Sequence, residues 1–452
     1  MQLALGYLAA LAPASVVAAG SRCRPGGNGH SSVTSAATKG GTTETVSWGT
    51  GFEDIYTSSA TDDVAAAAAT AKTSSPTSSV KGKAFDRYVT IWFENENYEK
   101  AIGDENFAWF AGKGITLTNF FGVTHPSEGN YVSAVCGDYF GMQNDDFNQI
   151  ALNVSSVVDL LEDKGVSWGM YQEDMPYTGY EGHEWLNQEN GANDYVRKHN
   201  PGVIPDSIAH YEQRLSQVKN LSMVDAGRSM FHTDLENDEL PQWMFITPNM
   251  TSDGHDSSAT VGGAWLRAFL GPLLEDEKFM KNTLVLVTWD ENETYAEQNR
   301  ILSILLGDAV PVDLVGTEDS SFYNHYSEIA TVEANWDLST LGRFDVGANV
   351  FAVVADQTGD TVRDWGAGES SSVVAFDDIF FNLSYAGAFN EEDGGNQQYP
   401  APNLDLDGAG SGRTILQSIK DTWEGSELAT YYTDAVEIPD GMHPPDGYAP
   451  VV

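Results

Sequence analysis

The sequence has few basic residues, few cysteines and no long apolar run beyond its first residues. Only 23 of its 452 residues are lysine or arginine, against 66 aspartates and glutamates, which gives a formal net charge of −43. A surface of this sign repels nucleic acid and anionic lipid, so neither is expected as a partner. Phosphate-bearing ligands would be repelled too, unless a local cation offsets the field. Titration of part of this charge at about pH 5 would relieve the self-repulsion, so an acidic or a salty environment would suit the chain.

The scarcity of cysteine and of apolar runs excludes two further classes of protein. The two cysteines, Cys23 and Cys136, cannot supply a disulfide framework for a chain of this length. Residues 1–19 combine a short apolar run with a small-residue ending, which is typical of a secretory signal peptide. No later segment is long and apolar enough to cross a membrane. We therefore expect an exported protein, secreted or in the cell wall, without a transmembrane or lipid anchor.

Sequons for N-linked glycosylation fit an exported route. Each Asn-x-Ser/Thr match is weak by itself, because such triplets are common by chance. The predicted glycosylation sites are Asn153, Asn220, Asn249, Asn292 and Asn382.

Composition divides the chain into four parts. After the predicted signal peptide, residues 20–80 are rich in Ser, Thr, Gly and Ala without a periodic apolar pattern, which predicts a disordered leader. Residues 81–390 form the predicted folded domain, in which about 175–205 is interpreted as an insertion or lid. Residues 391–452 form an acidic, Pro/Gly-rich C-terminal extension with one short predicted helix at 415–423.

Strand-like and helix-like segments alternate through the predicted domain. Strands are predicted at 87–93, 115–121, 166–171, 242–247, 283–289 and 301–306, and helices at 105–113, 157–164, 208–219, 224–235, 261–274 and 327–341. Apolar runs such as Leu284–Val287, flanked by helices, predict an α/β fold with a mainly parallel sheet sandwiched by helices. Ligands gather at the carboxyl ends of the strands in such sheets, so the residues that follow each strand are candidates for the site.

Carboxylates follow two of the predicted strands. Glu94 and Asn95 come after the first strand, and Asp290 and Glu291 after the most apolar one. Carboxylate and amide oxygens are the ligands that hard divalent cations prefer, and two acidic strand ends on one edge would repel each other without a cation between them. We therefore predict a divalent metal site at these four residues. The alternative is that they are solvated turn acids in a very acidic protein.

Histidines mark another strand end and a helix start. Asp253 and His255 lie in an Asp-Gly-His-Asp turn after the strand at 242–247, where His255 could hold a phosphate oxygen and protonate a leaving group. A plain turn with a surface histidine is the alternative. His325 opens a predicted helix whose dipole favours an anion. Six other histidines, His199 among them, are interpreted as surface or core residues.

Ser127 lies just before a predicted helix that includes residues 131–135. A hydroxyl in this position faces free backbone N–H groups, which suits a nucleophile beside an anion but equally describes an N-cap. His125 is close enough along the chain to contact the same ligand, or it points away.

The run from Ser127 to Gly137 is similar to the nucleophile segment of the alkaline phosphatase superfamily, with Asn130 three residues after the serine and Ser133 six after it. More closely, the chain resembles the fungal secreted acid phosphatases of the phosphoesterase family, which also contains bacterial phospholipases C. Segments that carry the resemblance recur in order over roughly 85–385, at 89–95, 114–119, 125–131, 171–177, 195–200, 247–256, 289–295 and 325–336.

This resemblance implies an alkaline phosphatase-like fold and a secreted acid phosphatase that hydrolyses small phosphomonoesters to inorganic phosphate. It implies that a hydroxyl attacks phosphorus, that a phosphoseryl enzyme forms, and that water hydrolyses it with the help of a divalent metal ion. The residue roles implied are catalytic for Ser127, His255 and His325, metal-binding for Glu94, Asn95, Asp290 and Glu291, and substrate-binding for Asn130, His125 and Asp253.

Several alternatives stay open at the level of sequence. The run from Thr124 to Ser127 also resembles the Cys-x-Pro-Ser motif of sulfatases, which would make Thr124 the nucleophile, although the spacing from Ser127 to Gly137 favours Ser127. The scaffold could instead serve a phosphodiesterase or phospholipase C, or an inert glycosylated wall or matrix protein. A monoesterase needs additional cationic contacts, and their possible sources are Arg197, Lys198 and Arg300.

Overall fold

The computed structural model describes residues 57–363 apart from 143, 226 and 296, together with 35–37, 44–46, 389, 399–408, 412–428, 430 and 432–434. The predicted signal peptide at 1–19, most of the predicted leader before residue 57, and Asn382 lie outside these residues. Within the described part of the chain, no helix combines the length and apolarity that crossing a bilayer requires.

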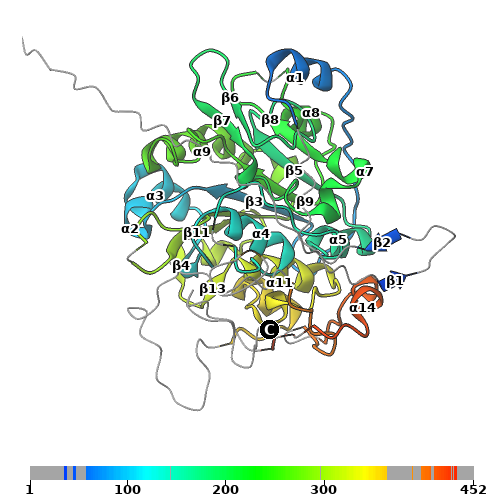
Figure 1. Ribbon diagram of the computed structural model, residues 1–452. Helices are drawn as coiled ribbons and strands as arrows, with labels where there is room; N and C mark the ends of the chain where they lie inside the picture. The colour runs from blue at the N-terminus through cyan, green and yellow to red at the C-terminus, as the bar shows by residue number, and fades with distance from the viewer. Residues whose placement is uncertain are drawn as a thin grey trace, which may run out of the picture.

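A nine-stranded sheet forms the centre of the fold (Figure 1). Eight strands pair in the order β12-β4-β11-β10-β3-β9-β5-β8, and β13 pairs with β4. Only β11 runs against the others, because its pairings with β10 and β4 are antiparallel and all other pairings in this sheet are parallel. The predicted α/β fold with a mainly parallel sheet is confirmed. The strands of this sheet are β3 (Arg87–Phe93), β4 (Ile115–Phe121), β5 (Trp168–Glu173), β8 (Val218–Leu221), β9 (Trp243–Thr247), β10 (Thr283–Trp289), β11 (Arg300–Leu306), β12 (Thr317–Asp319) and β13 (Tyr323–Asn324).

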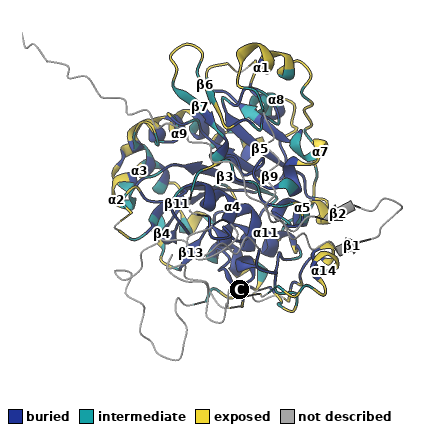
Figure 2. Cartoon of the chain, viewed as in Figure 1, coloured by how far each residue is buried: buried dark blue, intermediate teal, exposed yellow. Residues whose placement is uncertain are grey.

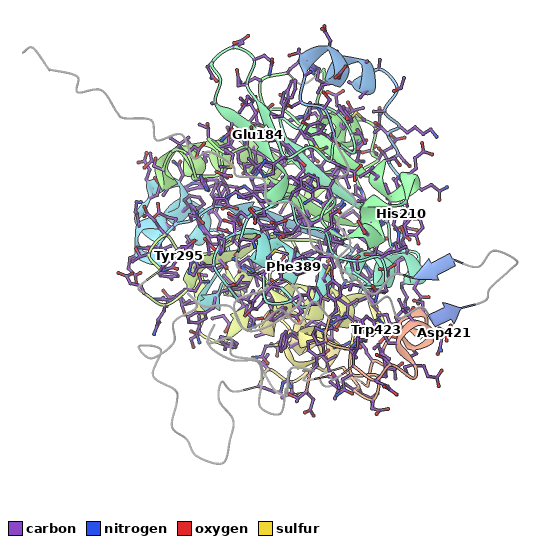
Figure 3. All side chains as sticks on the ribbon, in the orientation of Figure 1. Glu184, His210, Tyr295, Phe389, Asp421 and Trp423 are labelled. Atoms are coloured by element: carbon purple, nitrogen blue, oxygen red, sulfur yellow. The ribbon has the colours of Figure 1, made fainter. Side chains whose placement is uncertain are left out.

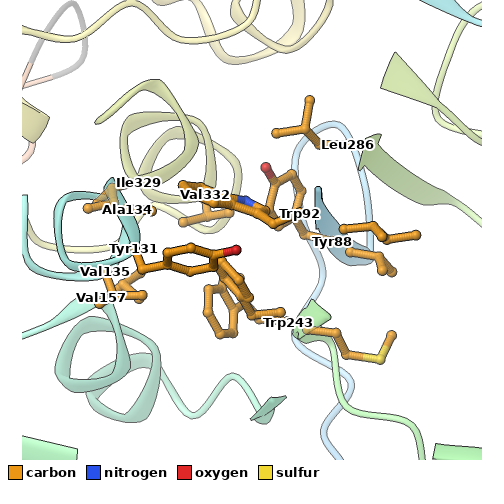
Figure 4. Packing of buried hydrophobic residues seen from close by; sticks show 14 of the residues in the cluster. Tyr88, Trp92, Tyr131, Ala134, Val135, Val157, Trp243, Leu286, Ile329 and Val332 are labelled. Atoms are coloured by element: carbon orange, nitrogen blue, oxygen red, sulfur yellow. The ribbon is translucent and has the colours of Figure 1, made fainter. Parts of the chain in front are cut away.

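Strand β3 shows how the sheet is covered on both faces. Successive side chains of a strand point to opposite faces. On one face, the Trp92 ring packs against Tyr131 of α4, at 4.9 Å between ring centroids (Figure 4). On the other face, Phe93 packs edge-on against Phe107 of α3 and Trp265 of α9. Because both faces are buried, the strand reads as a continuous apolar run rather than an alternating one.

Two helical layers follow from this arrangement. The layer that faces Trp92 contains α4 (Glu128–Cys136), α5 (Val157–Lys164) and α11 (Tyr326–Trp336), with α12 (Phe344–Gly347) and α13 (Ala352–Thr358) packed on α11. The opposite layer contains α2 (Tyr98–Gly103), α3 (Glu105–Ala111) and α9 (Ala259–Leu273). Every residue of α4 and α11 is buried (Figure 2), so both helices lie inside the fold rather than on its surface. The other helices are α1 (Thr61–Ala68), α6 (Asp206–Ala209), α7 (Glu212–Leu215), α8 (Met230–Glu236), α10 (Glu277–Met280) and α14 (Gln417–Trp423), with short 3-10 turns η1 (Arg197–His199) and η2 (Val312–Leu314).

The predicted helix at 208–219 is wrong for half of its length. The chain forms two single-turn helices, α6 and α7, separated by extended backbone at Tyr211, and then enters strand β8. Val218 and Leu221 are buried where β8 pairs in parallel with β5. Their apolar side chains pack at the edge of the sheet. Strand β5, with which β8 pairs, is distant in the sequence, so the local periodicity of 208–219 does not reveal it. The predicted helix at 224–235 begins only at Met230.

The predicted insertion at about 175–205 contains a separate two-stranded antiparallel sheet. Its strands are β6 (Glu184–Leu186) and β7 (Asn193–Val196), and η1 follows directly. A further antiparallel pair, β1 (Ser35–Ala37) with β2 (Glu44–Val46), lies in the N-terminal part of the chain.

The predicted disordered leader does not extend to residue 80. Residues 57–80 contain helix α1 and then lie against the domain, where Ser74 N donates to the Ser216 carbonyl at 2.9 Å. Ser75 reaches a fully buried ion pair: its hydroxyl donates to Asp234 Oδ1 at 2.6 Å, and Lys219 Nζ lies 3.0 Å from it. A buried ion pair is costly unless its remaining polar sites are satisfied, so this segment is part of the folded unit.

A buried carboxyl on α11 should make stability depend on pH. Burial raises the pKa of Glu328 to about 8, against hydrogen bonds that include the Tyr88 hydroxyl at 3.0 Å. Such a group stabilises the fold below its unfolded pKa, and the contribution is lost as pH rises toward 8. Glu328→Gln, which stays neutral, should therefore change the unfolding free energy little at pH 5 and raise it relative to wild type at pH 8, by on the order of a few kcal/mol. Urea unfolding at both pH values measures the difference. An equal effect at both would show that Glu328 does not titrate in this range.

Candidate active site

Three strand ends bring the predicted acidic residues together. Phe93 and Trp289 are paired in the parallel register of β3 and β10, so Glu94 and Asp290 leave adjacent strands at the same level. The Asn95 backbone N–H donates to Asp290 Oδ1 at 3.1 Å. The Asp253 carbonyl, from the loop after β9, accepts a hydrogen bond from the Glu94 N–H at 3.0 Å. The site therefore lies at the carboxyl edge of the sheet, where the sequence predicts it.

Ser127 directs its hydroxyl toward this edge. It stands at the N-cap position of α4, but its side chain makes no cap hydrogen bond and instead donates to Glu94 Oε2 at 3.1 Å. The cap interpretation is thus wrong for the hydroxyl, and the helix begins at Glu128, before the predicted stretch at 131–135. Thr124, the alternative nucleophile, has its hydroxyl 3.3 Å from the His125 carbonyl oxygen. No hydrogen bond links this hydroxyl to the acidic cluster, which is formed by Glu94, Asp253 and Asp290.

Three fully buried carboxyl groups share the site and repel one another. Burial, with the charges of Asp290 and Asp253, raises the pKa of Glu94 well above its usual value, and Lys198 opposes this effect. Burial raises the pKa of Asp290 to about 6, against hydrogen bonds from the Asn95 N–H and other nearby donors. The pKa of Asp253 is likewise raised by burial and by the Asp290 charge. Several negative charges in this space therefore require protons or a cation.

The chemistry of the donors fits a hard cation. Asp290 Oδ2, Asn95 Oδ1 and Asp253 Oδ2 are buried oxygens that accept no hydrogen bond, and buried acceptors are rarely left so. Oxygen donors of this kind suit Mg²⁺ or Ca²⁺ better than soft metals. In the described residues, no group of three or more His, Cys, Asp or Glu side chains is arranged to hold a metal ion. The metal site stays a prediction that depends on Asn95 and the Ser127 hydroxyl as well as on carboxylates.

Asn130 and Glu291 support the loop that carries the nucleophile. Asn130 Oδ1 accepts hydrogen bonds from the N–H groups of Val123 and Thr124, at 2.9 and 3.2 Å. Its Nδ2 donates to the Thr124 carbonyl and to Glu291 Oε2, each at 3.0 Å. The Asn130 amide therefore makes four hydrogen bonds within the protein, and these bonds hold the loop that precedes Ser127. A contact between Asn130 and the substrate stays a prediction.

The three predicted histidines have different surroundings. His325 is buried, its Nε2 is 2.6 Å from the Asp290 carbonyl oxygen, and burial lowers its pKa to about 3. Burial also lowers the pKa of His125 to about 3, and its ring packs against Tyr295, labelled in Figure 3, at 3.9 Å between centroids and an interplanar angle of 32°. His255 is partly exposed, and its Nδ1 lies 2.8 Å from Asp256 Oδ1. Of the three, His255 is the most exposed to solvent.

His199, which we interpreted as a surface or core residue, lies beside the carboxylates of Glu94 and Asp253. His199 Nε2 lies 3.2 Å from Glu94 Oε1, and Nδ1 lies 3.5 Å from Asp253 Oδ2. Its ring stacks on Tyr131, whose hydroxyl donates to Glu94 Oε1. The one signal in the sequence was that 195–200 belongs to the segments that carry the family resemblance.

The structure also bears on the predicted glycosylation sites. Asn153 and Asn292 are buried, and the Asn292 amide donates to the Thr294 carbonyl, so a glycan there would require the local structure to open. Asn220 and Asn249 are partly exposed, with amides that donate to the Arg228 carbonyl and to Asp174 Oδ2. The partly exposed pair are the better candidates among the described sequons.

A buried serine hydroxyl beside buried carboxylates, at the carboxyl edge of a mainly parallel α/β sheet, is an arrangement that suits the hydrolysis of an ester bond. The phosphoesterase family matches residues 102–339, and the chain belongs to this family.

Within the family, the chain is similar to acid phosphatases of fungi. It is 45% identical over 386 residues to an acid phosphatase of Aspergillus fumigatus, covering 84% of this chain and 83% of that protein. It is 46% identical over 362 residues to a probable acid phosphatase of Kluyveromyces lactis, covering 80% of this chain and 81% of that protein. The resemblance predicted from sequence is confirmed. Among solved structures, a protein in the alkaline phosphatase superfamily from Vibrio parahaemolyticus is similar over 58% of this chain and 67% of its own, with 8% identity and a TM-score of 0.37.

Proposed function

We propose that the protein is an exported acid phosphatase that hydrolyses phosphomonoesters to inorganic phosphate by double displacement at Ser127. The observation that carries the mechanism is the Ser127 hydroxyl, which stands at the start of α4 and donates to Glu94 where three strand ends meet. Relatives of 45% and 46% identity that are named acid phosphatases support the activity. Their similarity covers more than four fifths of the chain in one case and 80% in the other.

Residues of this chain bind the phosphoryl group, attack phosphorus and transfer protons. The phosphoryl group lies beside Ser127 at the N-terminus of α4, where the positive end of the helix dipole attracts its oxygens. Ser127 attacks phosphorus while Glu94 Oε2, already its hydrogen-bond acceptor, takes the proton. His255, the exposed imidazole, protonates the departing alkoxide. Water then hydrolyses the phosphoseryl ester, and phosphate leaves. Glu94, Asn95, Asp290 and Glu291 would hold a divalent cation, which would lower the pKa of the serine hydroxyl and offset phosphate charge.

The substrate class is tested by three substrates at pH 4–8. The wild-type protein should hydrolyse p-nitrophenyl phosphate under acid conditions faster than bis(p-nitrophenyl) phosphate or phosphatidylcholine. Faster cleavage of the diester would favour a phosphodiesterase on the same scaffold. An absence of activity on all three would favour the inert wall or matrix protein.

The predicted cation is tested by its removal. Dialysis of the protein against EDTA at neutral pH should lower the monoesterase rate at least about tenfold, because a bound cation would stabilise the charge of the transition state by several kcal/mol. Adding back individual divalent cations should restore the rate, and elemental analysis should find metal in the active protein. Full activity of a protein shown to be free of metal would exclude the metal-assisted mechanism.

A further inference from the structure

A monoesterase must recognise an oxygen that a diester does not offer. A phosphomonoester presents three non-bridging oxygens, whereas a diester has an organic group on one of them. Binding the additional oxygen as a hydroxyl or an anion calls for a cationic donor close to the nucleophile. The acidic cluster described above contains no such donor, so it must come from elsewhere in the fold.

Two of the three candidate cations, Arg197 and Arg300, make other contacts in the fold. The Arg197 guanidinium is buried and donates to the carbonyls of Asn148 and Val203, at 2.6 and 2.8 Å. Arg300 lies over the Tyr98 ring at 3.7 Å from its centroid, and its Nε donates to the Thr118 carbonyl at 2.8 Å. These contacts hold Arg197 inside the fold and Arg300 on a different surface.

Lys198 lies between Arg197, which is buried, and His199 in the 3-10 turn η1. His199 lies close to the carboxylates of Glu94 and Asp253. Lys198 Nζ is 2.9 Å from Asp145 Oδ2, and the other oxygen of the same carboxylate accepts a hydrogen bond from the Glu128 N–H at 3.0 Å. Glu128 follows the nucleophile directly, so the Asp145 carboxylate connects the ammonium group to the first N–H of α4. The Lys198 side chain is 17% exposed, which leaves it open to a ligand.

The charge of Lys198 also acts on the whole acidic cluster. Burial raises the pKa values of Glu94, Asp253 and Glu291, and in all three groups Lys198 is a cation that lowers them. Burial lowers the pKa of Lys198 itself, but the charges of Asp145 and Glu94 outweigh burial and raise it above its usual value. Lys198 is thus a cation that offsets part of the negative charge of these carboxylates.

We propose that Lys198 is the specificity residue for monoesters: its ammonium group, held by Asp145, binds the phosphate oxygen that carries the second organic group in a diester. Lysine has three N–H donors, of which Asp145 takes one, so the group can bind a phosphate oxygen without leaving its anchor. This inference rests on the proposed phosphatase function, and it supplies the local cation that so acidic a protein needs in order to attract a phosphate.

The test compares two substrates with the same leaving group. Lys198→Ala should lower kcat/KM for p-nitrophenyl phosphate about 10- to 100-fold, the range for the loss of a hydrogen bond to a charged group. For bis(p-nitrophenyl) phosphate it should change kcat/KM less than about threefold, so the ratio of the two values falls. Inhibition by inorganic phosphate should weaken in parallel. Lys198→Arg should recover much of the ratio, because it restores a cationic donor. Lys278→Ala, at an exposed lysine paired with Asp238, is the matched control and should leave the ratio unchanged.

The outcomes separate this inference from the function on which it rests. Equal losses for both substrates, with no recovery in Lys198→Arg, would assign Lys198 a structural role and overturn the inference alone. A wild-type protein that cleaves the diester but not the monoester would overturn both. If Lys198→Ala does not fold, Lys198→Met, which keeps the length of the side chain, gives the same comparison. Folding of each variant is checked by its urea unfolding midpoint.

Discussion

Replacing Ser127 by alanine is expected to lower kcat for p-nitrophenyl phosphate by at least about a thousandfold. The hydroxyl is the group that would form the covalent intermediate. Among the residues that the structure describes, the other hydroxyl hydrogen-bonded to Glu94 is that of Tyr131, which belongs to the buried core. The fold should tolerate the change, since the Ser127 side chain makes no cap hydrogen bond to α4. Steady-state rates and the urea midpoint of the variant measure the two effects.

Thr124→Ala is the matched control, because Thr124 is the alternative nucleophile and is equally buried. Its hydroxyl is 3.3 Å from a backbone carbonyl oxygen, and we expect the variant to keep kcat within about tenfold of wild type. If Thr124→Ala were inactive while Ser127→Ala kept its rate, the roles of the two residues would be exchanged.

Glu94→Gln is expected to reduce kcat about a hundredfold to ten-thousandfold, the range for loss of a general base. Glu94 accepts the hydrogen bond from Ser127, receives the Tyr131 hydroxyl on its other oxygen, and is one of the predicted metal ligands. The amide can still accept a hydrogen bond but cannot take up the proton, and it is a weaker metal ligand. The variant should therefore also contain less metal by elemental analysis.

Glu99→Gln provides the control for Glu94→Gln. Glu99 is an exposed carboxylate on the adjacent helix α2, 3.4 Å from Arg300, and its neutralisation should leave both rate and metal content unchanged. Wild-type kcat in Glu94→Gln would remove Glu94 from the mechanism. Loss of kcat with full metal content would keep it as a proton acceptor and reject it as a ligand.

The strands that carry the site could be predicted because they are buried on both faces. Runs such as 87–93 and 283–289 are mostly apolar, and their structural bounds match the prediction. The carboxylates that follow them were found by the rule that ligands gather at strand ends, and the structure brings Glu94 and Asp290 together. Whether these residues bind a metal remains a prediction.

The remaining features depend on contacts between distant parts of the chain. Residues 208–219 have an apolar pattern that a helix could use, but pairing with β5 makes the last part a strand. His199 and Lys198 follow a separate β-hairpin, and the packing of their 3-10 turn η1 against α4 brings them to Glu94 and Asp145. Likewise, Ser75 lies in a stretch of low-complexity composition, and its tertiary partners Lys219 and Asp234 cannot be inferred from composition. Residue types and spacing predicted the chemistry at the strand ends, whereas the groups that complete it come from tertiary contacts.

The most direct test of double displacement at Ser127 is to trap the covalent intermediate. Wild-type protein is mixed with ³²P-labelled phosphomonoester at acid pH, quenched with acid within the first turnover, digested and mapped by mass spectrometry. We predict that the label is on the peptide that contains Ser127, as phosphoserine, and that Ser127→Ala carries none. Label on Thr124, or a wild-type enzyme that turns over without any labelled peptide, would contradict the mechanism.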